Sequence, residues 1–145
     1  MRQDVAKPRS AVAAVVFDVL DPVPYGCFIG ALIFDAVYAS NAEVLWYKGA
    51  AWLIAIGLVF AVLPRLINLV RVWFPGGRPR IGGEIAGFWL NLLAVVAAIF
   101  NSFVHSRDAY AVMPEGLWLS CLTIVLLVLA RAMPTLQQAT ARARA

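Results

Sequence analysis

The 145-residue chain has few charged residues, a single histidine and two cysteines. Charged residues make up 14% of it, against roughly 25% in a soluble domain. The small charged fraction disfavours a disordered chain, and two cysteines are too few for a disulfide scaffold. The twelve basic residues are scattered between apolar runs, whereas a nucleic-acid binder gathers them in a patch. These features of the composition favour a membrane protein.

Motifs of the common enzyme classes are also missing. The sequence has no P-loop, dinucleotide-binding fingerprint, GxSxG, HExxH or CxxC. Because His105 is the only histidine, haem with two histidine ligands from one chain is excluded; haem would need Met113 or a second subunit's histidine. We therefore predict no metal and no cofactor. Haem b, a quinone, and a metal held by His105 with nearby aspartates stay open as alternatives.

Hydrophobic residues are abundant instead, at 63% of the chain with a mean hydropathy of +0.83. A soluble core of this length could not bury so much apolar surface. Crossing the hydrocarbon layer takes about 20 apolar residues in a helix, and four runs are long enough: 22–40, 47–70, 84–104 and 117–133. The fold class predicted is all-α, an integral membrane four-helix bundle forming one domain over residues 22–133.

The two flanks of this domain are short. Residues 1–21 form a segment in which the apolar run 11–17 follows a basic tail. We expect a short helix at the cytoplasmic interface there, with a signal peptide as the alternative. Pro134 is expected to end the last helix, since proline lacks the backbone donor. Residues 134–145 would then be a polar, frayed C-terminal tail.

Orientation follows from the basic residues, which concentrate on the cytoplasmic side of membrane proteins. Only Lys48 and Arg107 fall on one side of the predicted spans, and the other ten fall on the opposite side. Both termini should therefore be cytoplasmic, and the net charge of +4 reflects this topology. The outer ends of the spans should carry an aromatic belt of Tyr38, Trp46, Tyr47, Tyr110 and Trp118.

Asp35 is the most unusual residue, because it lies inside the first span, where an ionised carboxylate is costly. A functional interpretation makes it a contact for a proton, ion or cofactor. The alternative, which we favour, is a buried carboxylate that is protonated or bonded to a neighbouring helix. Its partners should come from the third span, where small and polar residues repeat every three or four positions: Gly87, Asn91, Ala94, Ala98, Asn101 and His105.

This stripe is interpreted first as a helix-packing seam, because small residues allow close approach and amides bond between helices. Gly26 and Gly30 of the first span, spaced by four, are assigned to the same kind of seam. At the outer end of the third span a polar cluster is expected. Its members would be Asp35, Asn101, His105, Arg107 and Asp108, forming either a functional site or a salt-bridged helix end.

Two segments resemble the DUF2231 family of bacterial membrane proteins. They are DPVPYGCFIGALIFDAVYAS (21–40) and NSFVHSRDAYAVMPEGLWLSCLTIVLLVL (101–129), and Asp35 and the block 105–108 are their most specific parts. The resemblance covers residues 21–134. It departs where many members carry histidines beside prolines ahead of the first span, since Asp18 and Asp21 stand there. The resemblance implies a four-span protein of the bacterial inner membrane with no assigned activity.

Relatives of that family resemble parts found near membrane dehydrogenases and Rieske-type proteins. This context associates the family with electron transfer, but it implies no mechanism. We expect a non-enzymatic structural or accessory subunit that anchors a redox partner. A first alternative is a cofactor- or quinone-binding electron-transfer module built on Asp35 and His105. A second alternative is proton or solute conduction through Asp35. Partners expected are the lipid bilayer and a membrane protein or a second copy of the chain, with no nucleic acid.

Overall fold

The computed structural model describes residues 19–73 and 82–143. This part consists of four long helices and one short 3-10 turn, and it contains no strand. The helices are α2 (Pro22–Asn41), α3 (Val44–Trp73), α4 (Gly82–Val104) and α5 (Glu115–Ala143), with η1 (Ala109–Ala111) before α5. The all-helical class and four long apolar helices are confirmed. The predicted interfacial helix at 11–17 lies outside the described residues.

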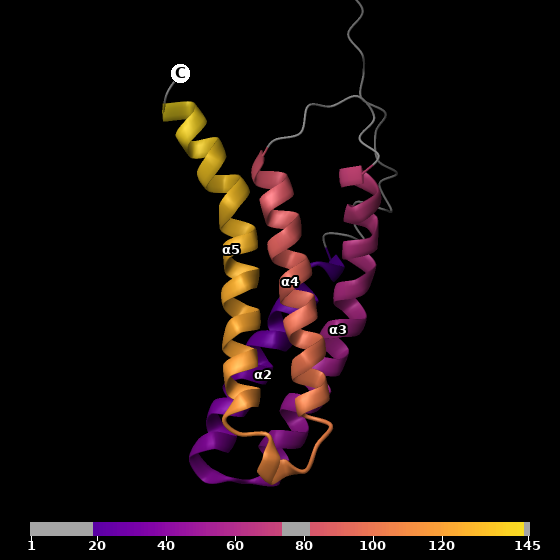
Figure 1. The fold of residues 1–145 in the computed structure, drawn as a ribbon, viewed down its shortest axis with the longest axis vertical. Coiled ribbons are helices and arrows are strands. Elements are labelled where there is room, and N and C mark those ends of the chain that lie inside the picture. Colours follow the sequence, from indigo (N-terminus) through magenta and orange to yellow (C-terminus); the bar gives the residue numbers. More distant parts are fainter. Residues whose placement is uncertain (1–18, 74–81, 144–145) are drawn as a thin grey trace, which may run out of the picture.

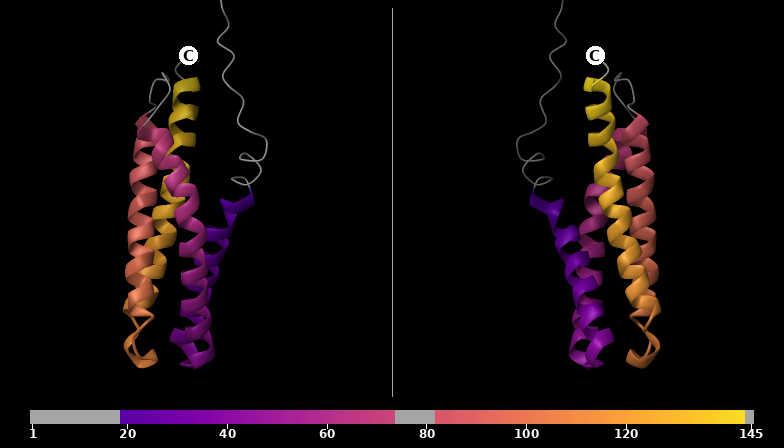
Figure 2. Two further views of the ribbon diagram at one scale, coloured as in Figure 1. Left: turned by 90° about the vertical axis from the view of Figure 1, so that its right-hand side faces the viewer. Right: turned by 90° about the vertical axis from the view of Figure 1, so that its left-hand side faces the viewer.

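The helices form a closed ring in which each contacts the next along the chain and α5 packs back against α2. Two hairpins, α2–α3 and α4–α5, therefore lie side by side (Figure 1). Their connections, residues 42–43 and 105–114, lie at one end of the bundle, here called the turn end (Figure 2). The opposite end, where α2 begins and α5 runs on past Met133, is called the open end.

The interior combines alanines with a few large side chains, and many of the large apolar side chains point outward. Ala94 and Ala98 of α4 pack with Phe28, Ala61 and Leu127 in the centre. The exposed set includes bulky apolar residues on three helices: Trp52, Trp89, Phe100, Phe103 and Trp118. Small residues inside and large ones outside are typical of helices that associate in lipid, where close packing rather than hydrophobic burial holds them together.

The connection between α2 and α3 consists of two residues, Ala42 and Glu43. Ala42 adopts the left-handed conformation (φ 56°), and its N–H donates to the Tyr38 carbonyl oxygen at 2.8 Å. The Asn41 side chain then accepts from the Glu43 N–H at 3.0 Å. This C-cap satisfies groups that a helix end otherwise leaves open, and it turns the chain directly into α3.

The last helix corrects one prediction, because α5 continues through Pro134 to Ala143. Proline removes the hydrogen bond to the carbonyl four residues earlier, that of Ala130. The Thr135 hydroxyl donates to the nearby Ala132 carbonyl at 2.7 Å, and such side-chain bonds let helices tolerate proline. Gly87 of α4 packs against the same place: a Cβ on it would lie 3.0 Å from the Ala130 oxygen. Residues 134–143, expected to be a frayed tail, are helical.

Candidate functional site

The stripe on α4 faces the interior of the bundle. Gly87, Ala94, Ala98, Asn101 and His105 are buried, and Asn91 is half-buried. The Asn91 amide donates to the Gly87 carbonyl of its own helix at 2.9 Å. Helical spacing therefore identified the inward face of α4 correctly, including its two polar residues at the turn end.

The glycines of α2 behave differently from each other. A Cβ on Gly30 would lie 3.0 Å from Leu53 Cδ1 of α3, so this glycine is at a close helix contact. Gly26 is exposed, and a Cβ there would meet no atom within 4 Å. Within the chain, the seam therefore includes Gly30 and not Gly26, because the rotation of α2 turns Gly26 outward.

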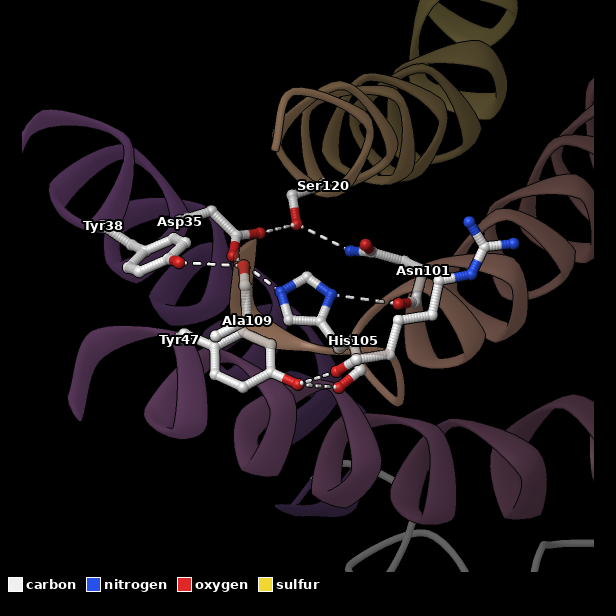
Figure 3. Close-up of polar contacts among 8 residues, drawn as sticks. Asp35, Tyr38, Tyr47, Asn101, His105, Ala109 and Ser120 are labelled. Atoms are coloured by element: carbon white, nitrogen blue, oxygen red, sulfur yellow. Dashed lines mark hydrogen bonds and ion pairs between the residues drawn. The ribbon is translucent and has the colours of Figure 1, made fainter. Parts of the chain in front are cut away.

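Four polar side chains from three helices meet in the interior near the turn end. They are Asp35 of α2, Asn101 of α4, His105 just after α4, and Ser120 of α5 (Figure 3). Their exposed fractions are 0%, 2%, 4% and 3%. This group, called the polar network below, contains every member of the predicted cluster except Arg107 and Asp108.

The bonds of the polar network form a closed ring. His105 Nε2 lies 2.8 Å from Asp35 Oδ1, and Ser120 Oγ donates to Asp35 Oδ2 at 2.5 Å. Asn101 Nδ2 donates to Ser120 Oγ at 2.7 Å. The ring closes through His105 Nδ1, which lies 3.0 Å from the Asn101 carbonyl oxygen. The carboxylate thus bonds both α5 and the end of α4, as the favoured interpretation of Asp35 anticipates.

The order of these groups limits the chemistry they support. In a nucleophilic triad the imidazole lies between serine and carboxylate, so that it can take the serine proton. Here the carboxylate lies between Ser120 and His105, and the serine hydroxyl points at Asp35. Both imidazole nitrogens are also occupied, Nδ1 by a carbonyl and Nε2 by Asp35. Ligation of haem iron or another metal by His105 would require one of these bonds to break.

Two tyrosines cover the polar network from hairpin α2–α3. The Tyr47 ring stacks on the His105 ring, with centroids 5.8 Å apart and planes 8° apart. Its hydroxyl lies 2.6 Å from the His105 carbonyl and 2.7 Å from that of Arg107. Tyr38, buried, donates to the Ala109 carbonyl at 2.8 Å. Both tyrosines had been expected in the aromatic belt at the outer ends of the spans; they lie at the turn end, and their hydroxyls tie α2 and α3 to the loop after α4.

The predicted cluster is therefore only partly assembled. The side chains of Arg107 and Asp108 are exposed, and Arg107 takes part through its backbone carbonyl, which accepts from Tyr47. They follow the end of α4 in an irregular segment, where the helical spacing that places Asn101 and His105 no longer applies. Sequence neighbours of His105 thus point to the surface while His105 itself points inward.

Ser120 is the member that sequence reasoning missed, because serine in an apolar helix readily bonds to its own backbone. A signal was present in the spacing. Buried positions on α5 repeat every three or four residues, matching the stripe on α4: Gly116, Ser120, Thr123, Leu127 and Ala130. Thr123 does bond to its own backbone, since its hydroxyl donates to the Leu119 carbonyl of the same helix at 2.8 Å.

A narrow gap borders the polar network. Asn101, Ser120 and Thr123 line this gap with apolar side chains of α2, α3 and α4, and it has no room for a water molecule. Asn101 Oδ1 is fully buried and has no hydrogen-bond partner. In such low-dielectric surroundings satisfied bonds are strong and an unsatisfied group is costly.

The open end carries a different polar contact. Arg131 of α5 pairs with Asp21, and its Nε donates to the Tyr25 hydroxyl at 3.1 Å. The guanidinium also lies over the Tyr25 ring, 4.7 Å from its centroid. The Arg131 side chain is 58% exposed. This group joins α5 to the start of α2 at the surface of the bundle.

Among the described residues no three His, Cys, Asp or Glu side chains gather as metal ligands, and both cysteines are free thiols. No family model matches the chain, and no curated protein or solved structure shows significant similarity to it. The resemblance to DUF2231 thus remains a prediction from the sequence.

Proposed function

We propose that this chain is a multi-pass protein of the bacterial inner membrane, with both termini cytoplasmic. It serves as a non-enzymatic accessory subunit that anchors a redox partner at the turn end. The apolar exterior of four helices supports the membrane location, and the distribution of basic residues supports the orientation. The redox partner comes from the resemblance to DUF2231.

The observation that carries the accessory role is the closure of the polar network. Asp35 bonds both His105 and Ser120 inside the bundle, and none of the three side chains is exposed. Apart from Asn101 Oδ1, which has no partner, the polar side-chain atoms of this buried network are hydrogen-bonded, and such bonds make a bundle rigid and specify one arrangement of its helices. Rigid helices with an apolar exterior suit a scaffold, whereas a relay or a cofactor site needs groups that are free to exchange partners.

The surface offered to a partner would be the turn end, which would face the periplasm in the proposed orientation. It is compact, because the two connections span only residues 42–43 and 105–114. Its exposed charged side chains are of both signs: Glu43, Lys48, Arg107, Asp108 and Glu115. Such mixed charges give specificity and orientation to a docking partner more than raw affinity.

Orientation is tested with a membrane-impermeant maleimide on intact cells. The native thiols are removed (Cys27→Ala, Cys121→Ala), and one new cysteine is placed at Arg107 or at Arg142. Arg107→Cys should react in intact cells, and Arg142→Cys only after the membrane is permeabilised. The reverse pattern would overturn the proposed orientation, and equal reaction at both positions in intact cells would contradict a membrane-spanning bundle.

The accessory role is tested by purification from the native membrane in mild detergent, followed by mass spectrometry and an absorption spectrum. A redox protein should co-purify in stoichiometric amount, and the double change Lys48→Glu, Arg107→Glu should release it. Arg142→Glu, a charge reversal at the other end, is the matched control and should leave the complex intact. A chain that always purifies alone, or that carries its own haem or quinone absorbance, would refute the proposal.

A further inference from the structure

The hydrogen bonds of the polar network fix where its hydrogens must be. His105 Nδ1 faces a backbone carbonyl, which only accepts, so Nδ1 carries a hydrogen. The Ser120 hydroxyl receives the Asn101 amide, so its own hydrogen points to Asp35 Oδ2. What remains is the 2.8 Å contact between His105 Nε2 and Asp35 Oδ1. A contact of that length between a nitrogen and an oxygen requires one hydrogen between them.

Two arrangements supply that hydrogen. Either an imidazolium donates to a carboxylate, or a carboxylic acid donates to a neutral imidazole. Both hold one proton more than a carboxylate beside a neutral imidazole, and both have zero net charge. Without the proton, lone pairs on Nε2 and Oδ1 would face each other in the buried interior, and an uncompensated negative charge would remain there.

We propose that the Asp35–His105 pair is a binding site for one proton, which the bundle requires to hold hairpin α2–α3 against hairpin α4–α5. Asp35 belongs to the first hairpin, and His105 and Ser120 belong to the second. The proton therefore acts as a ligand of the docked state. This inference goes beyond the accessory role and does not depend on it.

The other described titratable groups at the turn end either bond to backbone carbonyls or are exposed to solvent. Tyr38 of α2 and Tyr47 of α3 direct their hydroxyl hydrogens to backbone carbonyls of the loop. From α5, the group that contacts Asp35 is the neutral Ser120 hydroxyl. The charged side chains on the connections and helix starts are exposed: Glu43, Lys48, Arg107, Asp108 and Glu115. Their charges are screened by solvent, unlike those of the pair.

Counting protons gives the sign of the pH dependence. When the hairpins are apart, an aspartate titrates near pH ~3.9 and a histidine near pH ~6.5. Between these values the separated pair already holds one proton, so docking is independent of pH. Above pH ~6.5 docking takes up a proton, and its equilibrium constant should fall about tenfold for each pH unit. Below pH ~3.9 the separated pair holds two protons, and docking weakens again.

The matched variant is Asp35→Asn. Asparagine has nearly the same shape as aspartate, and its amide supplies the hydrogen that the Asp35–His105 contact otherwise takes from the bound proton. The asparagine amide donates to Nε2 of a neutral imidazole, and its carbonyl accepts from Ser120. In detergent, the transition from docked to separated hairpins is followed by near-UV circular dichroism during SDS titration from pH ~5 to pH ~9. Wild type should lose docking with the tenfold slope above pH ~6.5, and Asp35→Asn should show no slope there.

A control separates loss of docking from loss of the proton site. Tyr38→Phe removes the bond to Ala109 at the same end but titrates nothing in the pair. It should weaken docking by a similar factor at every pH and keep the wild-type slope. A wild-type protein without slope, or an Asp35→Asn variant with the full wild-type slope, would overturn the proposal.

A second measurement needs no variant. Because His105 is the only histidine, protein labelled with ¹⁵N-histidine reports the ring nitrogens of this residue alone. We expect Nδ1 protonated throughout, with Nε2 either protonated or accepting a hydrogen bond, and no change between pH ~5 and pH ~8. A midpoint near pH ~6.5, or a neutral ring with its hydrogen on Nε2, would overturn the proposal.

Discussion

The two ends of the bundle join α2 to α5 in opposite ways. At the turn end Asp35 of α2 meets Ser120 of α5 and His105 in the interior, where the carboxyl side chain is 0% exposed. At the open end Asp21 meets Arg131 across the surface, with the guanidinium side chain 58% exposed. Each contact pairs an aspartate with a basic residue, and they differ mainly in their access to water.

This difference decides what each contact contributes. An exposed ion pair is worth about 0.2–1 kcal/mol, because water and salt screen it. Removing one partner of a buried pair costs about 3–5 kcal/mol, because the other partner stays buried and unpaired. The turn end should therefore hold the hairpins in a single arrangement, while the open end tolerates change.

The largest effect is expected from Asp35→Ala. It leaves His105 Nε2 and the Ser120 hydroxyl without their carboxyl partner in the buried interior. We expect the free energy of unfolding, from SDS titration at pH ~6, to fall by about 3–5 kcal/mol. Asp35→Asn, which preserves both bonds, is the control. Equal losses in the two variants would show that the bonds of the polar network do not hold the turn end.

Ser120→Ala should have the next largest effect. Asp35 Oδ2 loses its donor and Asn101 Nδ2 its acceptor, so two groups are orphaned in the interior. The same titration should show a loss of about 2–3 kcal/mol. Thr123→Val is the matched change, since that hydroxyl bonds only within its own helix in the contacts observed. If Thr123→Val lowered the free energy of unfolding as much as Ser120→Ala, the loss would come from removing any buried hydroxyl on α5 and not from breaking the polar network.

Gly87→Ala tests the open end through packing. The new methyl group would lie 3.0 Å from the Ala130 carbonyl, a backbone atom that cannot rotate away. Helices α4 and α5 must then separate, at a cost of about 1–2 kcal/mol in the same assay. Gly26→Ala adds the same methyl group in open space and should be neutral or slightly stabilising, since alanine favours a helix. Destabilisation by Gly26→Ala would indicate that another chain packs on this face.

Arg131→Ala should have the smallest effect. It removes the pair with Asp21 and the contact over Tyr25, and both involve a guanidinium side chain that is 58% exposed. A loss below about 1 kcal/mol is expected, decreasing further when salt is added. A loss comparable with that of Asp35→Ala would abolish the contrast between the two ends.

Sequence patterns predicted the fold closely but the polar network only in part. Apolar run length placed all four helices, and the start of α2 at Pro22 was correct. The spacing of Asn101 and His105 identified their common inward face. The inward position of Tyr38 and the role of Ser120 were not predictable in the same way. A helix that is apolar on all sides gives little information in its sequence about which face turns inward.

Pro134 is a second case in which the sequence alone was not enough, because it predicted a helix end that the structure does not have. Proline predicts a helix end, because a donor is lost and the ring crowds the preceding turn. Whether the helix continues depends on neighbours that the local sequence does not contain. Here Gly87 of α4 approaches the affected carbonyl, and Thr135 bonds the carbonyls nearby.

The sequence by itself determined the number of long apolar helices, the approximate place of each in the chain and the presence of one costly carboxylate among apolar residues. These depend on composition and short-range spacing, which act within a single helix. The tertiary structure decided which groups satisfy that carboxylate, because residues 35, 105 and 120 come together only when two hairpins dock. Docking fixes the rotation of each helix, and rotation determines whether a polar side chain meets a partner or the surrounding medium.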